Sequence, residues 1–113
     1  MQIEEQVKIF KALSNHHRLS IYLKLVDCCE VGTLCSTDGS DIDTCVGEVA
    51  SGHKLAPSTV SHHLKELRQA GLIKMEKRGQ RSFCYVIPEM LEELGRFFQS
   101  QLNQSSVKNK VVV

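Results

Sequence analysis

The chain has 113 residues, of which 42% are hydrophobic and 24% are charged. This length and composition predict one globular domain and exclude a wholly disordered chain. No apolar run reaches the roughly 18 residues that a membrane-spanning helix needs, and the first residues lack the pattern of a secretory signal. Five cysteines, an odd number, in a chain without an export signal predict free thiols in the cytoplasm rather than a disulfide framework.

The net charge of +1 conceals an uneven distribution along the chain. Residues 1–53 hold four Lys or Arg against eight Asp or Glu, which gives −4. Residues 54–81 hold seven against two, which gives +5, and residues 82–113 are neutral. A block of positive charge is typical of a surface that binds a polyanion, but it also fits an ordinary solvated face.

The first half of the chain predicts two helices and a long loop. Apolar residues repeat at spacings of 3 and 4 over 2–13 and 16–28, and Ser14 and Asn15 are suitable caps for the second helix. Between residues 30 and 44 the repeat gives way to Gly, Ser, Thr and Asp, which predicts a loop of about 15 residues. Most of the cysteines lie in or beside this loop: Cys28, Cys29, Cys35 and Cys45.

The next segment predicts a short helix, a tight turn and a longer helix. The short helix is expected over 45–52, with Asp43 or Thr44 as its N-cap. Pro57 suits the first turn of the following helix, expected over 58–70, because its missing N–H is not needed there. This succession is the helix-turn-helix pattern, whose second helix enters the major groove of DNA.

The remaining residues predict a β-hairpin and a last helix. Apolar and polar residues alternate in 72–87 on both sides of a basic turn that contains glycine. Pro88 opens a helix with a further apolar stripe. The fold class expected is mainly α with a β-hairpin wing, a winged helix-turn-helix of five helices. Its domain is expected to span 1–102, followed by a flexible tail over 103–113.

The basic block has the chemistry of a DNA-reading surface. Val60, Leu64 and Leu67 form the apolar stripe of the longer helix, which leaves its polar side for a partner. Short hydrogen-bonding groups lie where a groove-inserted helix meets base edges, and cations lie where phosphates are expected. The candidate DNA-binding residues are Ser58, Thr59, Ser61, His62, Lys65 and Arg68 on the helix, and Arg78, Gln80 and Arg81 on the wing.

Four segments of the chain resemble the ArsR/SmtB family of metal- and metalloid-responsive repressors, and their order and spacing are also those of that family. Together they fall within residues 6–98. They are Phe10-Lys-Ala-Leu-Ser14 with Arg18-Leu19, Pro57-Ser-Thr-Val-Ser-His-His-Leu-Lys-Glu-Leu67, Ala70-Gly-Leu-Ile73, and Lys77-Arg-Gly-Gln-Arg-Ser-Phe-Cys-Tyr85. The resemblance implies a cytoplasmic homodimer that represses transcription and releases its operator when an inducer binds.

A dimer is also expected from the apolar surface of the chain. The first and last helices each present an apolar stripe, and little chain remains to cover both. In the family these helices pair across a two-fold axis. Two reading helices would then lie about one DNA turn apart, ~34 Å, which predicts an operator with an inverted repeat.

The cysteines suggest an inducer that reacts with thiols. Soft thiolates select soft ions, so trivalent arsenic or antimony bound by Cys28, Cys29, Cys35 and Cys45 is the favoured hypothesis, and no cofactor is required otherwise. Cys45 resembles the first residue of the family's Cys-Val-Cys arsenic motif. Here Gly47 replaces the second cysteine, so the family's site on that helix does not carry over unchanged.

Several alternatives remain open at this point. The thiols could form a redox or polysulfide switch, another inducer such as a small organic ligand could act, or the cysteines could be incidental apolar residues. The domain could also bind a protein instead of DNA. An enzyme is disfavoured because the chain has no Gly-rich phosphate loop, acidic pair or catalytic triad. The last helix has no His or Asp, so the family's zinc site on that helix is not expected.

The histidines receive modest roles. His62 is a candidate base reader, and His63 is expected to be a partly buried histidine packed on the neighbouring helix. His16 and His17, at a helix start, are expected to be exposed and without function. His53 is disfavoured as an additional metal ligand.

Overall fold

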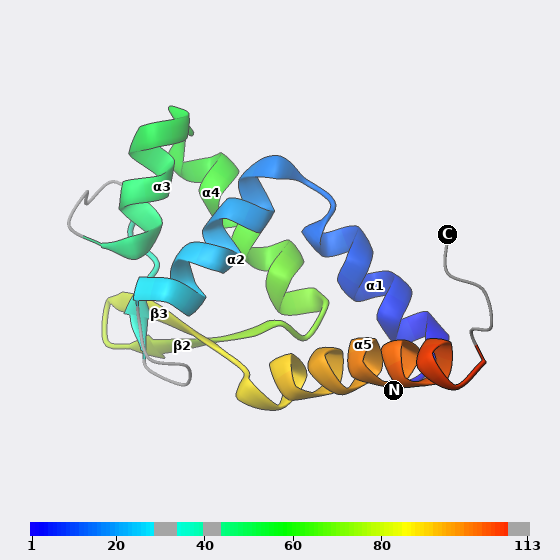
Figure 1. Ribbon diagram of the computed structural model, residues 1–113. Coiled ribbons are helices and arrows are strands. Elements are labelled where there is room, and N and C mark those ends of the chain that lie inside the picture. The colour runs from blue at the N-terminus through cyan, green and yellow to red at the C-terminus, as the bar shows by residue number, and fades with distance from the viewer. Residues whose placement is uncertain (29–33, 40–43, 109–113) are drawn as a thin grey trace.

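The computed structural model describes residues 1–28, 34–39 and 44–108 and shows a winged helix-turn-helix (Figure 1). No helix in those ranges is both long enough and apolar enough to cross a membrane. The elements in chain order are α1 (Ile3–Leu13), α2 (His16–Cys28), β1 (Cys35–Ser36), α3 (Cys45–His53), α4 (Pro57–Gln69), β2 (Ile73–Arg78), β3 (Arg81–Val86) and α5 (Pro88–Lys108).

The helix starts follow the signals in the sequence. The Arg18 backbone N–H donates to Asn15 Oδ1 at 3.0 Å, so Asn15 caps the start of α2. Thr44 caps α3, because its Oγ1 accepts a hydrogen bond of 2.8 Å from the Gly47 backbone N–H. Pro57 occupies the first turn of α4. These contacts confirm the expected caps of α2 and α3, and the starts of α2, α3 and α4 lie within about two residues of the predicted ones.

The turn between α3 and α4 fixes the start of α4, which is the expected DNA-reading helix and is called the reading helix below. Lys54 ends α3 with φ of +57°, in the left-handed region that L-residues seldom adopt. The Leu55 N–H donates to the Ala50 carbonyl at 2.9 Å, which closes this end of the helix. The chain can therefore reverse sharply, and α4 packs through Val60, Leu64 and Leu67, each at most 1% exposed.

The sheet contains one strand that the sequence analysis missed. β2 and β3 form the expected hairpin, whose tip has Arg78 opposite Arg81 and Gly79 at φ of +64°. β1 then pairs antiparallel with the other edge of β3, which gives the order β1-β3-β2. The expectation of a loop throughout 30–44 is therefore wrong at Cys35–Ser36. The reason lies in the tertiary structure. A strand of two residues forms only because it can make backbone hydrogen bonds with the free edge of β3.

The core lies between α2, α3, α4 and the sheet. On α2 the buried residues are Ile21, Tyr22 and Leu25, each at most 3% exposed. Leu19 and Leu23, which also belong to an apolar repeat, are 38% and 55% exposed. The α2 sequence is apolar on more than one side, so only the neighbours decide which side is buried.

α1 and α5 lie side by side at the end of the molecule opposite the wing (Figure 1). The ring of Phe10 on α1 lies 6.2 Å from that of Phe97 and 6.0 Å from that of Phe98 on α5. α5 continues to Lys108, so residues 103–108 are helical, although they were expected to belong to the flexible tail. No Gly or Pro interrupts residues 96–108, and Gln99 donates to Asn103 Oδ1 at 3.2 Å across that boundary. The rest of the expected tail, 109–113, lies outside the described residues.

Candidate nucleic-acid interface

The polar side of α4 is open to solvent, because the opposite side supplies core residues. Ser58, Ser61, His62, Lys65 and Arg68 are exposed, and Thr59 is half-buried. Ala56 gives α4 no side-chain cap, so the helix start retains backbone N–H groups that favour an anion. The structure therefore brings all six candidate residues of this helix onto one accessible surface.

The wing adds cations at the tip of the hairpin. Arg78, Gln80 and Arg81 are exposed there, as the sequence predicted. The Arg78 Nε donates to Glu76 Oε2 at 2.9 Å, and the Arg81 guanidinium lies 5.7 Å from the centre of the Phe83 ring. Such exposed contacts hold the side chains only weakly, so both arginines remain available to phosphate.

Two adjoining hollows form a groove between α4 and the wing. One, of about 270 Å³, is lined by Thr37, Ser61, Leu64, Lys65, Arg68, Met75 and Ser82. The other, of about 290 Å³, is lined by Arg68, Met75, Glu76, Lys77 and Ser82. Lys65 and Arg68 on the α4 wall and Lys77 on the wing wall, beside Glu76, suit the sugar-phosphate backbone of a duplex whose bases would be read by α4. Sequence reasoning did not select Thr37, Lys77 or Ser82, although the basic run before the wing tip already indicated Lys77.

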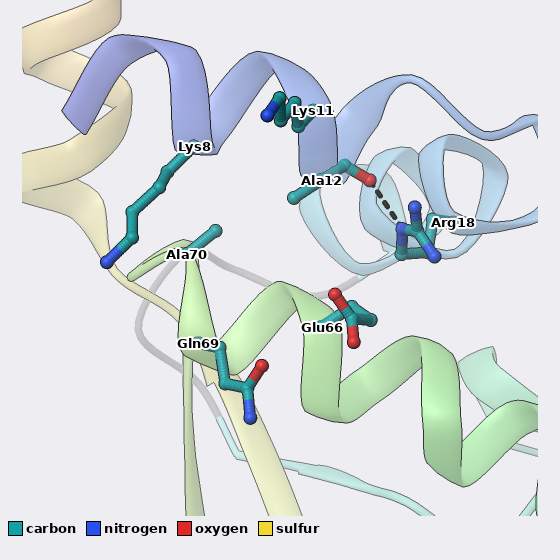
Figure 2. A pocket seen from close by; sticks show the side chains of 7 residues that line it. All are labelled: Lys8, Lys11, Ala12, Arg18, Glu66, Gln69 and Ala70. Atoms are coloured by element: carbon teal, nitrogen blue, oxygen red, sulfur yellow. Dashed lines mark hydrogen bonds between the residues drawn. The ribbon is translucent and has the colours of Figure 1, made fainter. Parts of the chain in front are cut away.

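Arg18 fixes the reading helix relative to α1. Its Nε donates to the Ala12 carbonyl at the end of α1 at 2.6 Å, and its Nη1 lies 3.4 Å from His63 Nδ1 on α4. Figure 2 shows this arginine beside a cavity of about 270 Å³ that is also lined by Lys8 and Lys11 of α1 and by Glu66 of α4. Because α1 is a candidate dimer helix, Arg18 connects the candidate dimer surface to the DNA-reading surface.

All five histidines of the chain gather beside the start of α4. His17 and His53 form a hydrogen bond of 2.6 Å between their Nδ1 atoms, in which one ring donates and the other accepts. The rings of His16 and His53 stack with centres 5.3 Å apart, and those of His17 and His63 are 5.9 Å apart. His63 is buried, as predicted, whereas His17 is half-buried and bonded to His53, so the expectation that it is exposed is wrong. The close approach of α2 and α3 is a tertiary feature that local sequence does not encode.

The cysteines depart from the expectation of free thiols. Cys35 and Cys45 are disulfide-bonded in this structure, so that expectation is wrong for both. The side chain of Cys28 and all of Cys29 lie outside the described residues. Cys84 carries a free thiol that is fully buried, and burial raises its pKa to about 11. Among the residues that can be described, no three His, Cys, Asp or Glu side chains are arranged to hold a metal ion.

Comparisons with known proteins agree with this geometry. Residues 40–75 match the model of the family described as "Bacterial regulatory protein, arsR family". The chain is 33% identical over 103 residues to an uncharacterized HTH-type transcriptional regulator, YbzH, of Bacillus subtilis, covering 87% of this chain and 99% of that protein. This chain belongs to the ArsR family. Members of the family are transcriptional regulators and not enzymes.

Two solved structures show the same fold as this ArsR-family chain. An ArsR-like transcriptional regulator from Rhodococcus sp. RHA1 is 18% identical, with a TM-score of 0.69 over 96% of this chain and 89% of that one. The homodimeric winged helix-turn-helix DNA-binding domain Mb0332 from Mycobacterium bovis is also 18% identical, with a TM-score of 0.58 over 98% and 90%. At these identities the comparison establishes the winged architecture and leaves the inducer open.

His63 predicts how the stability of this ArsR-family protein depends on pH. Burial, and then the nearby Arg18 guanidinium, lower the pKa of His63 below its usual 6.5. The unfolded chain therefore binds this proton more tightly than the folded protein does. The contribution to stability is complete above pH 6.5 and is lost as the pH falls below it through the pKa of the folded state.

We expect the melting temperature to decrease between pH 7.5 and pH 5.5, and to decrease less in His63→Gln than in the unaltered protein. Differential scanning calorimetry at constant ionic strength measures this difference. The matched control is His62→Gln, which removes an exposed imidazole from the next position and should retain the original pH dependence. Equal pH dependence in His63→Gln and the unaltered protein would contradict the assignment.

Proposed function

We propose that this ArsR-family chain is a transcriptional repressor that binds operator DNA as a homodimer and releases it when its cysteines react. The observation that carries the proposal is the open polar side of α4 beside a wing and groove that are lined with Lys and Arg. Binding needs no cofactor, and the expected place of action is the cytoplasm. The alternative, in which the same surface binds a protein, does not account for cations on both walls of the groove.

Each group of residues has a distinct task in this proposal. Ser58, Thr59, Ser61 and His62 would meet base edges in the major groove, where short polar side chains discriminate between base pairs. Lys65 and Arg68 would meet the phosphates that pass through the groove, and the wing arginines would reach the adjacent minor groove. Removing a phosphate contact should weaken binding to every sequence alike, whereas removing a base contact should relax sequence preference.

The salt dependence of binding tests this assignment. With about six phosphate contacts, the logarithm of the binding constant should fall with the logarithm of salt concentration at a slope near −5, and Lys65→Ala should reduce the slope by about 1. Fluorescence anisotropy with a labelled inverted-repeat duplex at several salt concentrations gives both values. Arg96→Gln, which removes a positive charge from exposed α5, should leave the slope unchanged. A flat salt response would favour a protein partner instead.

A homodimer through α1 and α5 accounts for the large apolar residues exposed on these helices. Ile3, Val7, Phe98 and Leu102 are between 44% and 71% exposed, and they continue the contact that Phe10 makes with α5. Residues of this size seldom gather on a surface that stays in water. The Mb0332 domain, which shares the fold, is homodimeric. A two-fold axis at this end of the molecule would present the two α4 helices to one face of a duplex.

Disrupting this surface should separate the protomers. Phe98→Glu places a carboxylate at the centre of the proposed contact, and desolvating that charge should shift the protein to a monomer and reduce operator affinity at least tenfold. Sedimentation velocity and anisotropy measure the two effects. Leu23→Glu is the matched control, because Leu23 is 55% exposed on α2 and Phe98 is 56% exposed. A dimer that persists in Phe98→Glu would place the interface elsewhere.

Thiol oxidation is the inducing reaction that the structure supports best. Cys35 and Cys45 are disulfide-bonded; Cys35 lies within the loop predicted over 30–44, and Cys45 directly follows that loop at the start of the helix-turn-helix. Capture of trivalent arsenic or antimony by Cys28, Cys29, Cys35 and Cys45 is the second candidate. It is favoured by the number of clustered thiols, and it requires these cysteines to be reduced first, because thiolates and not disulfides bind the ion.

The two inducers can be separated on one reduced protein–operator complex. Addition of inorganic polysulfide should release the operator and leave a protein with disulfide or persulfide bonds, whereas arsenite would leave a protein that has gained arsenic. Native mass spectrometry of the released dimer distinguishes the products. The triple variant Cys28→Ser, Cys29→Ser, Cys45→Ser should resist both reagents. Release that is undiminished in this variant would exclude the cysteines as the sensor.

A further inference from the structure

A short segment lies between the reading helix and the wing. Thr37 donates two hydrogen bonds to the Ser82 carbonyl of β3, from its backbone N–H at 3.1 Å and from its Oγ1 at 3.2 Å. Two residues on, Gly39 passes so close to α4 that a Cβ there would lie 3.2 Å from Val60 Cγ1. We call residues Ser36–Gly39 the inserted segment, because they contact the two elements that form the DNA-binding groove.

The inserted segment lies close to both disulfide-bonded cysteines. Cys35 immediately precedes it and lies opposite Cys84 in the pairing of strands β1 and β3. At the other end the Asp38 carbonyl accepts a hydrogen bond of 3.0 Å from Thr44 Oγ1, and Thr44 adjoins Cys45. Cys35 and Cys45 are both disulfide-bonded, so a change in their thiol state would alter residues that adjoin or contact this segment.

The segment brings a carboxylate to the DNA-binding wing. A cavity of about 270 Å³ is lined by Ser36, Thr37, Asp38, Gln80, Arg81 and Ser82, so Asp38 and the cationic tip of the wing border the same space. A carboxylate in this position offsets the attraction of the wing for phosphate and repels the DNA backbone. Thr37 also lines the groove together with Lys65 and Arg68, so the segment lies along the proposed path of the DNA backbone.

We propose that the inserted segment is an internal inhibitor of operator binding whose position depends on the thiol state of Cys35 and Cys45. With both cysteines disulfide-bonded, the segment is held against β3 and Asp38 weakens the binding of phosphate by the wing. This inference rests on the proposed operator binding and names how that binding is regulated. On reduction by a dithiol, each disulfide takes up two electrons and two protons to give two thiols, the dithiol becomes a cyclic disulfide, and the segment is free to leave the groove.

The first test compares operator affinity in the two thiol states. Anisotropy with the inverted-repeat duplex is measured for the oxidised dimer and for the dimer reduced with dithiothreitol. Reduction should tighten binding by the unaltered protein. Asp38→Asn should tighten binding by the oxidised protein about three- to tenfold and leave the reduced protein unchanged, since the carboxylate acts only when the segment is held in place. Glu92→Gln, which removes an exposed carboxylate from α5, should alter neither state.

The outcomes separate this inference from the proposed function. Equal tightening of both thiol states by Asp38→Asn would show a general charge effect and overturn the inference, as would no tightening in either state. In both cases the reduced, unaltered protein would still bind the duplex, so the proposed function would stand. Failure of that protein to bind any duplex would overturn both.

The second test follows the segment without DNA. Cys84 is 0% exposed and lies directly opposite Cys35, so β1 helps to cover its thiol. Alkylation of Cys84 by iodoacetamide, read by peptide mass spectrometry, should be faster in the reduced protein than in the oxidised protein. Thr37→Val should accelerate it in the oxidised protein by removing the hydroxyl contact to Ser82. Ser36→Ala is the control and should not accelerate alkylation. The Ser36 Oγ accepts a hydrogen bond from the Asp38 N–H within the segment and not from β3. Equal rates in both thiol states would show that the segment does not move.

Discussion

The burial of one side of α4 is the constraint on which the rest of the structure depends. Val60, Leu64 and Leu67 are each at most 1% exposed. Full burial of such side chains contributes about 1.5–3 kcal/mol each, whereas an exposed polar contact contributes about 1 kcal/mol or less. Rotation of the helix about its axis would expose these three side chains and lose their burial energy, so the polar side has to face solvent. The candidate reading surface is thus fixed by residues on the opposite, buried side of the helix.

Three contacts then connect this helix and its immediate neighbours to other parts of the molecule. Arg18 joins the end of α1 to His63, which connects the proposed dimer surface to α4. The hydrogen bond between His17 and His53 joins the start of α2 to the end of α3 beside the same helix. The inserted segment contacts Val60 and the wing together. Coupling free energies in allosteric proteins are typically about 1–3 kcal/mol, which a few polar contacts of this kind can supply.

The position of the cysteines explains how a reaction of their thiols could affect DNA binding without a large conformational change. In the sequence they flank a loop that lies far from the reading residues. In the structure β1 pairs with the free edge of β3, so that Cys35 lies opposite Cys84 and Thr37 borders the groove with Lys65. A disulfide closes a local loop and restricts the conformations of the chain between its ends. In the proposed regulation, restricting residues that already border the candidate groove would change that groove without displacing α3 as a whole.

The sequence by itself determined the helices, the caps of α2 and α3, the wing hairpin and the exposed polar side of α4, because each depends on local periodicity, turn chemistry or charge. Pro57, Thr44 and the apolar stripe of α4 determine the structure of residues close to them in the sequence. Signals of this kind can therefore be recognised from the sequence alone. The tertiary structure alone decided which side of α2 is buried, that Cys35–Ser36 forms a strand and that His17 meets His53. Thr37 and Ser82 are 45 residues apart, and the two histidines are 36 apart. Contacts at that separation depend on how the finished helices and strands pack, and no local pattern in the chain specifies them.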